Sequence, residues 1–124
     1  MKFILAFFIL TLPTLVTEKP RSDEKGLFRV VKIQSIHDYY VIYASKDNLK
    51  YKIVSKKQSR DGCVKIRRNQ EYKFELKELE FLGGSEVNCV SFDKRTIICR
   101  CEDEDCAFGL FMTNNLQGLC LIDG

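Results

Sequence analysis

The chain has 124 residues, with 20 Lys and Arg side chains, 17 Asp and Glu side chains and a formal net charge of +3 at pH 7. This length corresponds to one domain. His37 is the single histidine, which excludes acid–base catalysis by a pair of histidines within one chain.

The N-terminal segment has the layout of a secretory signal peptide. Lys2 is followed by a nearly continuous apolar run over residues 3–12, and Pro13 and Thr17 come after it. A membrane span needs ~20 consecutive apolar residues, so this run is too short. We expect a signal peptide over residues 1–17, a flexible charged leader over 18–26 and one β-rich domain over 27–124. The protein is then secreted and extracellular, with no membrane span after removal of the signal.

All the cysteines follow this segment, and their number is even. Export places them in an oxidising compartment, where thiols pair. We expect three disulfides among these positions, with the pairing left open: Cys63, Cys89, Cys99, Cys101, Cys106 and Cys120.

The first half of the domain is rich in β-branched and aromatic residues. The pattern predicts strands over residues 28–36, 39–44 and 51–55, with a turn over 45–48. Two adjacent apolar residues, Val30 and Val31, break the alternation of the first strand and predict a bulge. The segment 39–44 is apolar on both faces, which is typical of a central strand.

Two further strands alternate between apolar and basic residues. In residues 63–67, Val64 and Ile66 are expected to face the core while Lys65 and Arg67 face outward. In residues 72–77, the apolar face and the charged face also alternate, through Tyr72, Phe74 and Leu76 on one side and Lys73, Glu75 and Lys77 on the other.

Residues 87–101 predict a hairpin with a loop at 93–95. In that register Phe92 faces Thr96 and Val90 faces Ile98, and Cys89 faces Cys99 closely enough for a disulfide. We expect a last strand over residues 107–112 and one helical turn within 113–120. Together these elements predict an all-β fold: a small disulfide-stapled antiparallel barrel of the oligonucleotide/oligosaccharide-binding (OB) type, or a sandwich, of about six short strands.

Residues 39–44 (Tyr-Tyr-Val-Ile-Tyr-Ala) and 51–55 (Tyr-Lys-Ile-Val-Ser) resemble small secreted plant proteins of unassigned function, as does the ending 115–120 (Asn-Leu-Gln-Gly-Leu-Cys). The resemblance covers most of the domain loosely, and Gln117 stands where the family more often has Lys. It implies a single-domain, secreted, disulfide-bearing protein and no particular activity.

The sequence contains no motif for a nucleophile, and His37 is expected at a strand end on the surface. We therefore expect no enzyme, no catalytic residues and no cofactor; a pair of carboxylates for glycoside hydrolysis is the alternative. The acidic residues 102–105 are interpreted as a solvated loop between bridged cysteines, since the cysteine spacing is not that of a zinc site. A cation site is the alternative reading of that loop, and we expect no metal.

Basic residues gather in the middle of the chain, and several fall on the outward positions of predicted strands. If those strands are neighbours, they form one face for an anionic ligand, comprising Lys50, Lys52, Lys65, Arg67, Arg68, Lys73 and Lys77. A solvated barrel exterior is the ordinary alternative.

We expect a secreted interaction protein of the defence, signalling or effector type that binds another extracellular protein. The alternative is binding of an anionic polysaccharide or lipid through the basic face. A further alternative is an enzyme inhibitor that presents loop 58–62 or 93–95, with Arg60, Lys94 or Arg95 as the bait. Nucleic acid is not an expected partner, because the chain is exported and lacks a recognisable aromatic stacking platform.

Overall fold

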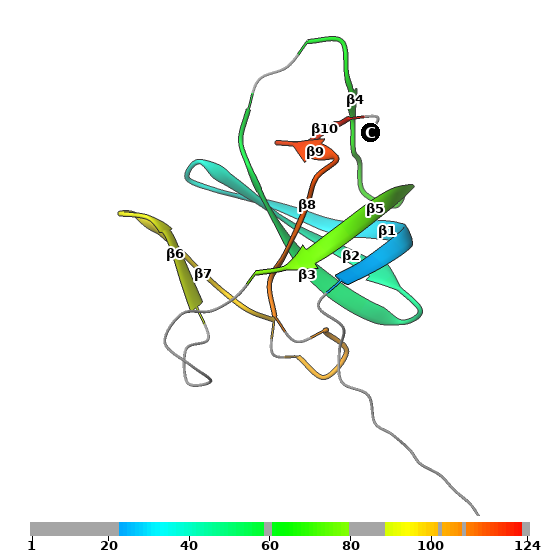
Figure 1. Cartoon of the computed structure of the whole chain (residues 1–124), viewed down its shortest axis with the longest axis horizontal. Helices are drawn as coiled ribbons and strands as arrows, with labels where there is room; N and C mark the ends of the chain where they lie inside the picture. The colour runs from blue at the N-terminus through cyan, green and yellow to red at the C-terminus, as the bar shows by residue number, and fades with distance from the viewer. Residues whose placement is uncertain (1–22, 59–60, 80–88, 102, 108, 123–124) are drawn as a thin grey trace, which may run out of the picture.

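The computed structural model describes residues 23–58, 61–79, 89–101, 103–107 and 109–122 (Figure 1). The expected signal peptide and the first part of the leader lie outside the described residues. No helix in the described part of the chain is long and apolar enough to cross a membrane. The elements are all strands: β1 (Asp23–Ile36), β2 (Tyr39–Lys46), β3 (Leu49–Lys56), β4 (Val64–Lys65), β5 (Glu71–Glu78), β6 (Cys89–Asp93), β7 (Thr96–Cys99), β8 (Phe111–Thr113), β9 (Leu116–Gln117) and β10 (Cys120–Leu121).

Five strands close into a barrel in the order β1-β2-β3-β8-β5. β1, β2 and β3 are joined by hairpins, and β5 returns to lie beside β1, which is a Greek key. β8 closes the barrel by pairing antiparallel with β5 and parallel with β3. The expected all-β fold is thus confirmed as a five-stranded Greek-key barrel of the OB type, with one parallel pairing.

Local sequence signals set the strand ends. Asp47 and Asn48 have φ angles of 55° and 68° and form the two-residue loop between β2 and β3. Positive φ at both positions is the geometry of a type I′ turn, which suits Asp and Asn. The turn is therefore shorter than the predicted 45–48. The predicted bulge in β1 is confirmed as a register shift between Val30 and Lys32.

β1 begins earlier than predicted. Residues 23–26, assigned to the flexible leader, pair with the end of β5. Glu24 Oε2 also lies 2.6 Å from Lys46 Nζ, which ties the start of β1 to the end of β2. Gly26 adopts a φ of 142°, and a Cβ at this position would meet Lys46 Cε at 2.8 Å. The hydrophobic pattern did not predict this segment, because the segment is not held by burial of apolar side chains. Backbone pairing, an ion pair and a glycine that allows close packing hold it instead.

Aromatic side chains fill the barrel. Phe28 contacts Tyr51 edge to face and packs against Phe74, while Tyr51 also meets Phe111 edge to face. Phe28, Phe74 and Phe111 are all buried. The alternation predicted for residues 72–77 is confirmed, since Phe74 and Leu76 are buried and the charged residues between them are exposed.

A second apolar cluster lies on the outer face of β2 and β3. Val41 and Val54 are buried there against Ile98 and Leu110, with Phe92 packed alongside. Side chains of the hairpin β6–β7, drawn at the left of Figure 1, supply Ile98, Val90 and Phe92 to this cluster. This packing explains why residues 39–44 are apolar on both sides: Ile42 faces the barrel interior and Val41 faces the hairpin.

The register of the hairpin is partly as predicted. Cys89 pairs with Cys99 and Val90 with Ile98, as expected. Thr96, however, lies opposite Asp93 rather than Phe92, because the ladder is irregular between Ser91 and Asp93.

The end of the chain forms a small sheet in the order β4-β10-β9, so the helical turn predicted within 113–120 is wrong. Leu116 of β9 and Ile66, which follows β4, are buried in the barrel core, and Ser55 Oγ donates a hydrogen bond to the Gly118 carbonyl at 2.7 Å. Val64 is 65% exposed although it was predicted to share the core face with Ile66. Only residues 64 and 65 of the predicted strand 63–67 form a strand. The predicted alternation of core-facing and outward residues therefore does not extend to Ile66.

All six cysteines are paired. The predicted Cys89–Cys99 bridge is present, and the others are Cys63–Cys120 and Cys101–Cys106. The bridges differ in the length of chain that they close, with sequence separations of 57 for Cys63–Cys120 and 5 for Cys101–Cys106.

Removal of the long-range bridge is expected to destabilise the fold more than removal of the short one. From chain entropy, Cys63→Ala/Cys120→Ala lowers the free energy of unfolding by about 4 kcal/mol and Cys101→Ala/Cys106→Ala by about 2 kcal/mol. Urea denaturation of both variants, each retaining its other two bridges, measures the difference. Equal losses, or a larger loss for the short bridge, would contradict this assignment.

Candidate functional site

The structure divides the predicted basic face between separate surfaces. Lys50 and Lys52 lie on β3, while Lys73 and Lys77 lie on β5, and β8 separates these two strands in the barrel. Lys65 belongs to β4 in the other sheet. Strands that alternate alike along the sequence are thus not neighbours, and the seven basic residues do not share one face.

Two of the seven basic residues are engaged by their own chain. Lys50 Nζ lies 3.5 Å from Asp105 Oδ2, and the Lys50 amide donates to the Asp105 carbonyl at 2.8 Å. Lys52 Nζ donates to the Cys99 carbonyl at 2.6 Å and lies 5.7 Å from the centre of the Tyr43 ring. These contacts leave Lys50 and Lys52 poorly placed to meet an external anion.

Electrostatics around Lys52 follow from this packing. Partial burial lowers the pKa of Lys52 most, nearby Lys32 lowers it further, and the Asp103 carboxylate raises it. Burial likewise raises the pKa of Tyr43, whose ring lies between the Lys32 and Lys52 ammonium groups. The acidic residues after Cys101 therefore compensate the basic residues of β3.

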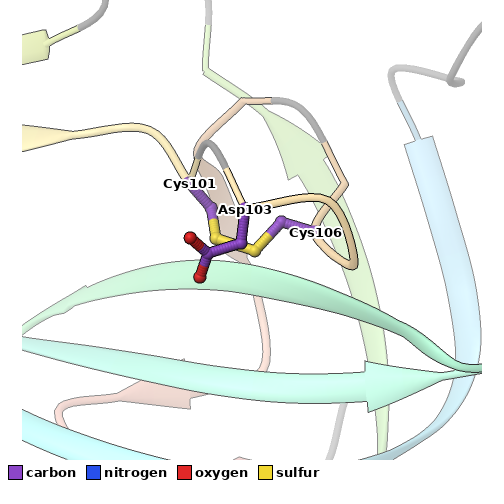
Figure 2. A group of neighbouring side chains, drawn as sticks. All are labelled: Cys101, Asp103 and Cys106. Atoms are coloured by element: carbon purple, nitrogen blue, oxygen red, sulfur yellow. A yellow bond between two sulfur atoms is a disulfide. The ribbon is translucent and has the colours of Figure 1, made fainter.

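The acidic residues 103–105 lie in a loop closed by the Cys101–Cys106 bridge, a pairing that the sequence left open. Figure 2 shows the Asp103 carboxylate beside the sulfur–sulfur bond, and one atom from each of the three residues lies within 4.8 Å of the others. Thiolates bind soft metals, but these two sulfurs are bonded to each other. While the bridge is intact, only the carboxylate of this group has the chemistry of a metal ligand.

The other five basic residues are exposed: Lys65, Arg67, Arg68, Lys73 and Lys77. Among the described residues, none of them has a carboxylate within salt-bridge distance. Their charges are therefore available to an external anion.

Two of these cations line a groove of about 630 Å³ beside β4, which we call the β4 groove. Its described lining residues include no Asp or Glu, and they are Cys63, Val64, Lys65, Arg67, Gln70 and Tyr72. The volume is within the usual range of ligand sites, about 300–1,000 Å³.

Covalent and hydrogen-bonded contacts hold the wall of the β4 groove in place. Lys65 pairs with Cys120, which is bridged to Cys63. Between the two groove cations, the Ile66 amide donates to the Leu119 carbonyl at 2.8 Å and its side chain is buried. Tyr72, near the start of β5, accepts a hydrogen bond from the Arg67 amide at 2.9 Å. The cations are thus carried on a fixed backbone.

A second groove, of about 680 Å³, lies between the starts of β1 and β5 and the end of β10. Lys25 and Lys73 line it together with Glu75, so its charge is mixed. The Asn115 side chain in this groove is occupied, since it donates to the Lys73 carbonyl at 2.7 Å and accepts from Thr113 Oγ1 at 2.6 Å. This groove is less suited to an anion than the β4 groove.

His37 has a structural contact. It occupies the β1–β2 turn with a φ of 50°, and its Nδ1 lies 3.1 Å from the Oγ1 of buried Thr96 on β7. Tyr39 packs against Phe92 of β6 nearby, with ring centres 5.1 Å apart. Both contacts fasten the hairpin to the barrel.

Of the two loops predicted as inhibitor loops, the structure describes 93–95 fully and 58–62 only in part. Arg60 lies outside the described residues. Lys94 and Arg95 form the exposed tip of the β6–β7 hairpin, where Asp93 Oδ1 accepts a hydrogen bond from the Arg95 amide at 2.9 Å.

Sequence reasoning found Lys65 and Arg67 but missed their neighbours. Gln70 lies between the strands predicted over residues 63–67 and 72–77, and the predicted alternation places Val64 and Tyr72 on the apolar faces of those strands. Lys65 lies beside Cys120 in a part of the fold that the Cys63–Cys120 bridge joins. The sequence did not determine the disulfide pairing, so no local signal indicated this groove.

Comparison of the chain with models of known protein families gave no match, and comparisons with curated proteins and with solved structures gave none either.

The effect of the acidic loop on the basic charge of β3 can be tested by measuring the pKa of Lys52. Asp103→Asn is expected to lower the pKa of Lys52 further, because it removes a carboxylate that raises this pKa, and Lys32→Ala is expected to raise it. NMR titration of the Lys52 side chain measures both shifts. Shifts of the reverse sign would show that Asp103 and Lys32 do not act on Lys52 as the structure implies.

Proposed function

We propose that this chain is a secreted, extracellular binding protein without catalytic activity, and that its ligand is anionic and occupies the β4 groove. The observation that carries the proposal is the groove itself, where Lys65 and Arg67 stand without a carboxylate in the described lining. Cations that have no carboxylate partner among the described residues are the groups that an external anion can pair with.

The position of the ligand follows from the packing of the hairpin. Barrels of the OB type bind oligonucleotides and oligosaccharides on the face formed by their second and third strands. Here part of that face is covered, since Val41 is 0% exposed and Val54 is 1% exposed where Ile98 and Phe92 of β6–β7 pack against them. A ligand surface elsewhere on the barrel is therefore favoured, and nucleic acid is not the ligand that we propose.

Secretion is supported by the composition of residues 1–17 and by the pairing of all six cysteines, since disulfides persist in oxidising compartments. Membership of the small secreted plant proteins that the sequence resembles remains part of this proposal. The absence of catalysis is supported by the use of His37 as a contact for the hairpin and by the bonding of every thiol.

A second candidate is the binding of another protein through the β6–β7 hairpin. The Cys89–Cys99 bridge closes this hairpin, its tip exposes Lys94 and Arg95, and Ile97 is 65% exposed on its outer surface. A rigid, exposed hairpin with an apolar residue and two cations suits a partner with an acidic pocket. A defence, signalling or effector role, or inhibition of a protease, would use this element.

The anionic-ligand proposal predicts salt-dependent retention on an anionic matrix. Lys65→Ala/Arg67→Ala is expected to weaken binding about tenfold at physiological salt, because two exposed ion pairs of up to ~1 kcal/mol each are lost. The salt concentration required for elution measures the change.

The matched control is Lys94→Ala/Arg95→Ala, which removes the same charge from the hairpin tip. It is expected to elute close to the unmodified protein. If the two variants elute alike, net charge rather than the β4 groove governs retention, and the proposal fails.

For the second candidate, an inhibitor of trypsin-like enzymes would present Lys94 or Arg95 to the acidic pocket of the protease. Stoichiometric inhibition of trypsin that Lys94→Ala/Arg95→Ala abolishes and Lys65→Ala/Arg67→Ala preserves is the expected result for that role. Cleavage of the hairpin without inhibition would exclude it.

A further inference from the structure

We propose that the β4 groove recognises an acidic sugar unit of a polysaccharide, so that it reads the saccharide as well as the negative charge. This inference rests on the proposed function and deepens it. Three kinds of group meet in the groove, and each matches a different part of an acidic pyranose.

The charged groups match the carboxylate or sulfate of the sugar. The Arg67 guanidinium is planar and pairs with a carboxylate through two parallel hydrogen bonds, while the Lys65 ammonium acts as a compact point charge. Both side chains line the groove from one short segment, on either side of buried Ile66. One anionic group placed between them can contact both.

The neutral polar groups match hydroxyls. The Tyr72 oxygen accepts a hydrogen bond from the Arg67 amide, which leaves the hydroxyl proton to be donated to a ligand. The exposed side-chain amide of Gln70 offers both a donor and an acceptor. A charged polymer without hydroxyls can accept from these groups, but it offers no proton to the Gln70 carbonyl.

The apolar groups match the C–H face of a sugar ring. Val64 is 65% exposed at the edge of the groove, and Cys63 with its bridge lies next to it. Contact with a pyranose would remove this apolar surface from water, which is favourable. The exposure of Val64, which contradicts its predicted place in the core, thereby acquires a reason.

A membrane surface fits the site less well than a polysaccharide. Bilayer binding by a barrel exterior calls for apolar side chains gathered beside the cations on one surface. Among the described residues, the two most exposed large apolar side chains are Val64 and Ile97, and they lie in different sheets. The cations are also set in a groove, which accommodates a single chain of sugar units.

Isothermal titration calorimetry of the full oxidised protein at physiological salt tests the inference with three probes. These are a hexamer of galacturonate, a linear polyphosphate with the same number of anionic units, and vesicles of phosphatidylcholine and phosphatidylserine. We expect the galacturonate hexamer to bind about tenfold more tightly than the polyphosphate, with no measurable binding to the vesicles.

A variant that leaves the charge of the groove unchanged separates recognition of the sugar from recognition of the negative charge. Val64→Ser/Gln70→Ala is expected to weaken hexamer binding about fivefold, as for the loss of one hydrogen bond and some apolar contact, and to weaken polyphosphate binding by clearly less. The control is Ile97→Ser/Gln34→Ala, which makes the same replacements at exposed positions away from the groove and is expected to bind like the unmodified protein.

The outcomes distinguish this inference from the proposed function. Equal affinity for hexamer and polyphosphate, with no effect of Val64→Ser/Gln70→Ala, would overturn the saccharide inference and leave anion binding standing. Binding to vesicles but not to the hexamer would also overturn it. If neither soluble probe binds and retention on the anionic matrix ignores Lys65→Ala/Arg67→Ala, the proposed function fails as well.

Discussion

The closure of the barrel by β8 is the constraint on which the rest of this structure depends. β8 is three residues long, yet it joins β3 to β5, and Phe111 carries its contact into the core at 1% exposure. The chain between β5 and β8 must leave the barrel and return to it. That excursion contains both the β6–β7 hairpin and the acidic loop, and the chain after β8 reaches the segment that forms the β4 groove.

Each consequence of this path concerns where a ligand can bind. The hairpin packs against the outer face of β2 and β3, so part of the usual binding face of this barrel type is taken up by a second apolar cluster. The acidic loop is laid beside Lys50 and Lys52, so part of the basic charge is compensated within the chain. The returning strand β10 pairs with β4 and is bridged to Cys63 just before it, which fixes Lys65 and Arg67 on the rim of a groove whose described lining includes no carboxylate. The path of the chain therefore determines that Lys50 and Lys52 lie beside carboxylates while Lys65 and Arg67 do not lie beside described ones.

The sequence predicted features that depend on near neighbours. The bulge in β1, the apolar character of both faces of β2, the alternation in β5 and the Cys89–Cys99 bridge all follow from residues close together in the chain. It did not predict features that depend on distant pairing. Val64 was placed in the core because it alternates with Lys65, whereas the small sheet with β10 turns it outward. The prediction that the basic residues share one face was wrong for the same reason. Alternation shows on which side of a strand a residue lies, but it does not show which strand is its neighbour.

The most direct test of this account is a backbone NMR titration of the oxidised, isotope-labelled protein with galacturonate hexamer. We expect the largest amide shifts within residues 63–72 and at the paired residues of β10, and we expect the amides of β2 and β3 that pack against the hairpin to stay unchanged. Shifts centred on residues 41–54, or along the β6–β7 hairpin, would contradict it, because the ligand would then occupy the face that we describe as covered or the surface that we assign to a second partner.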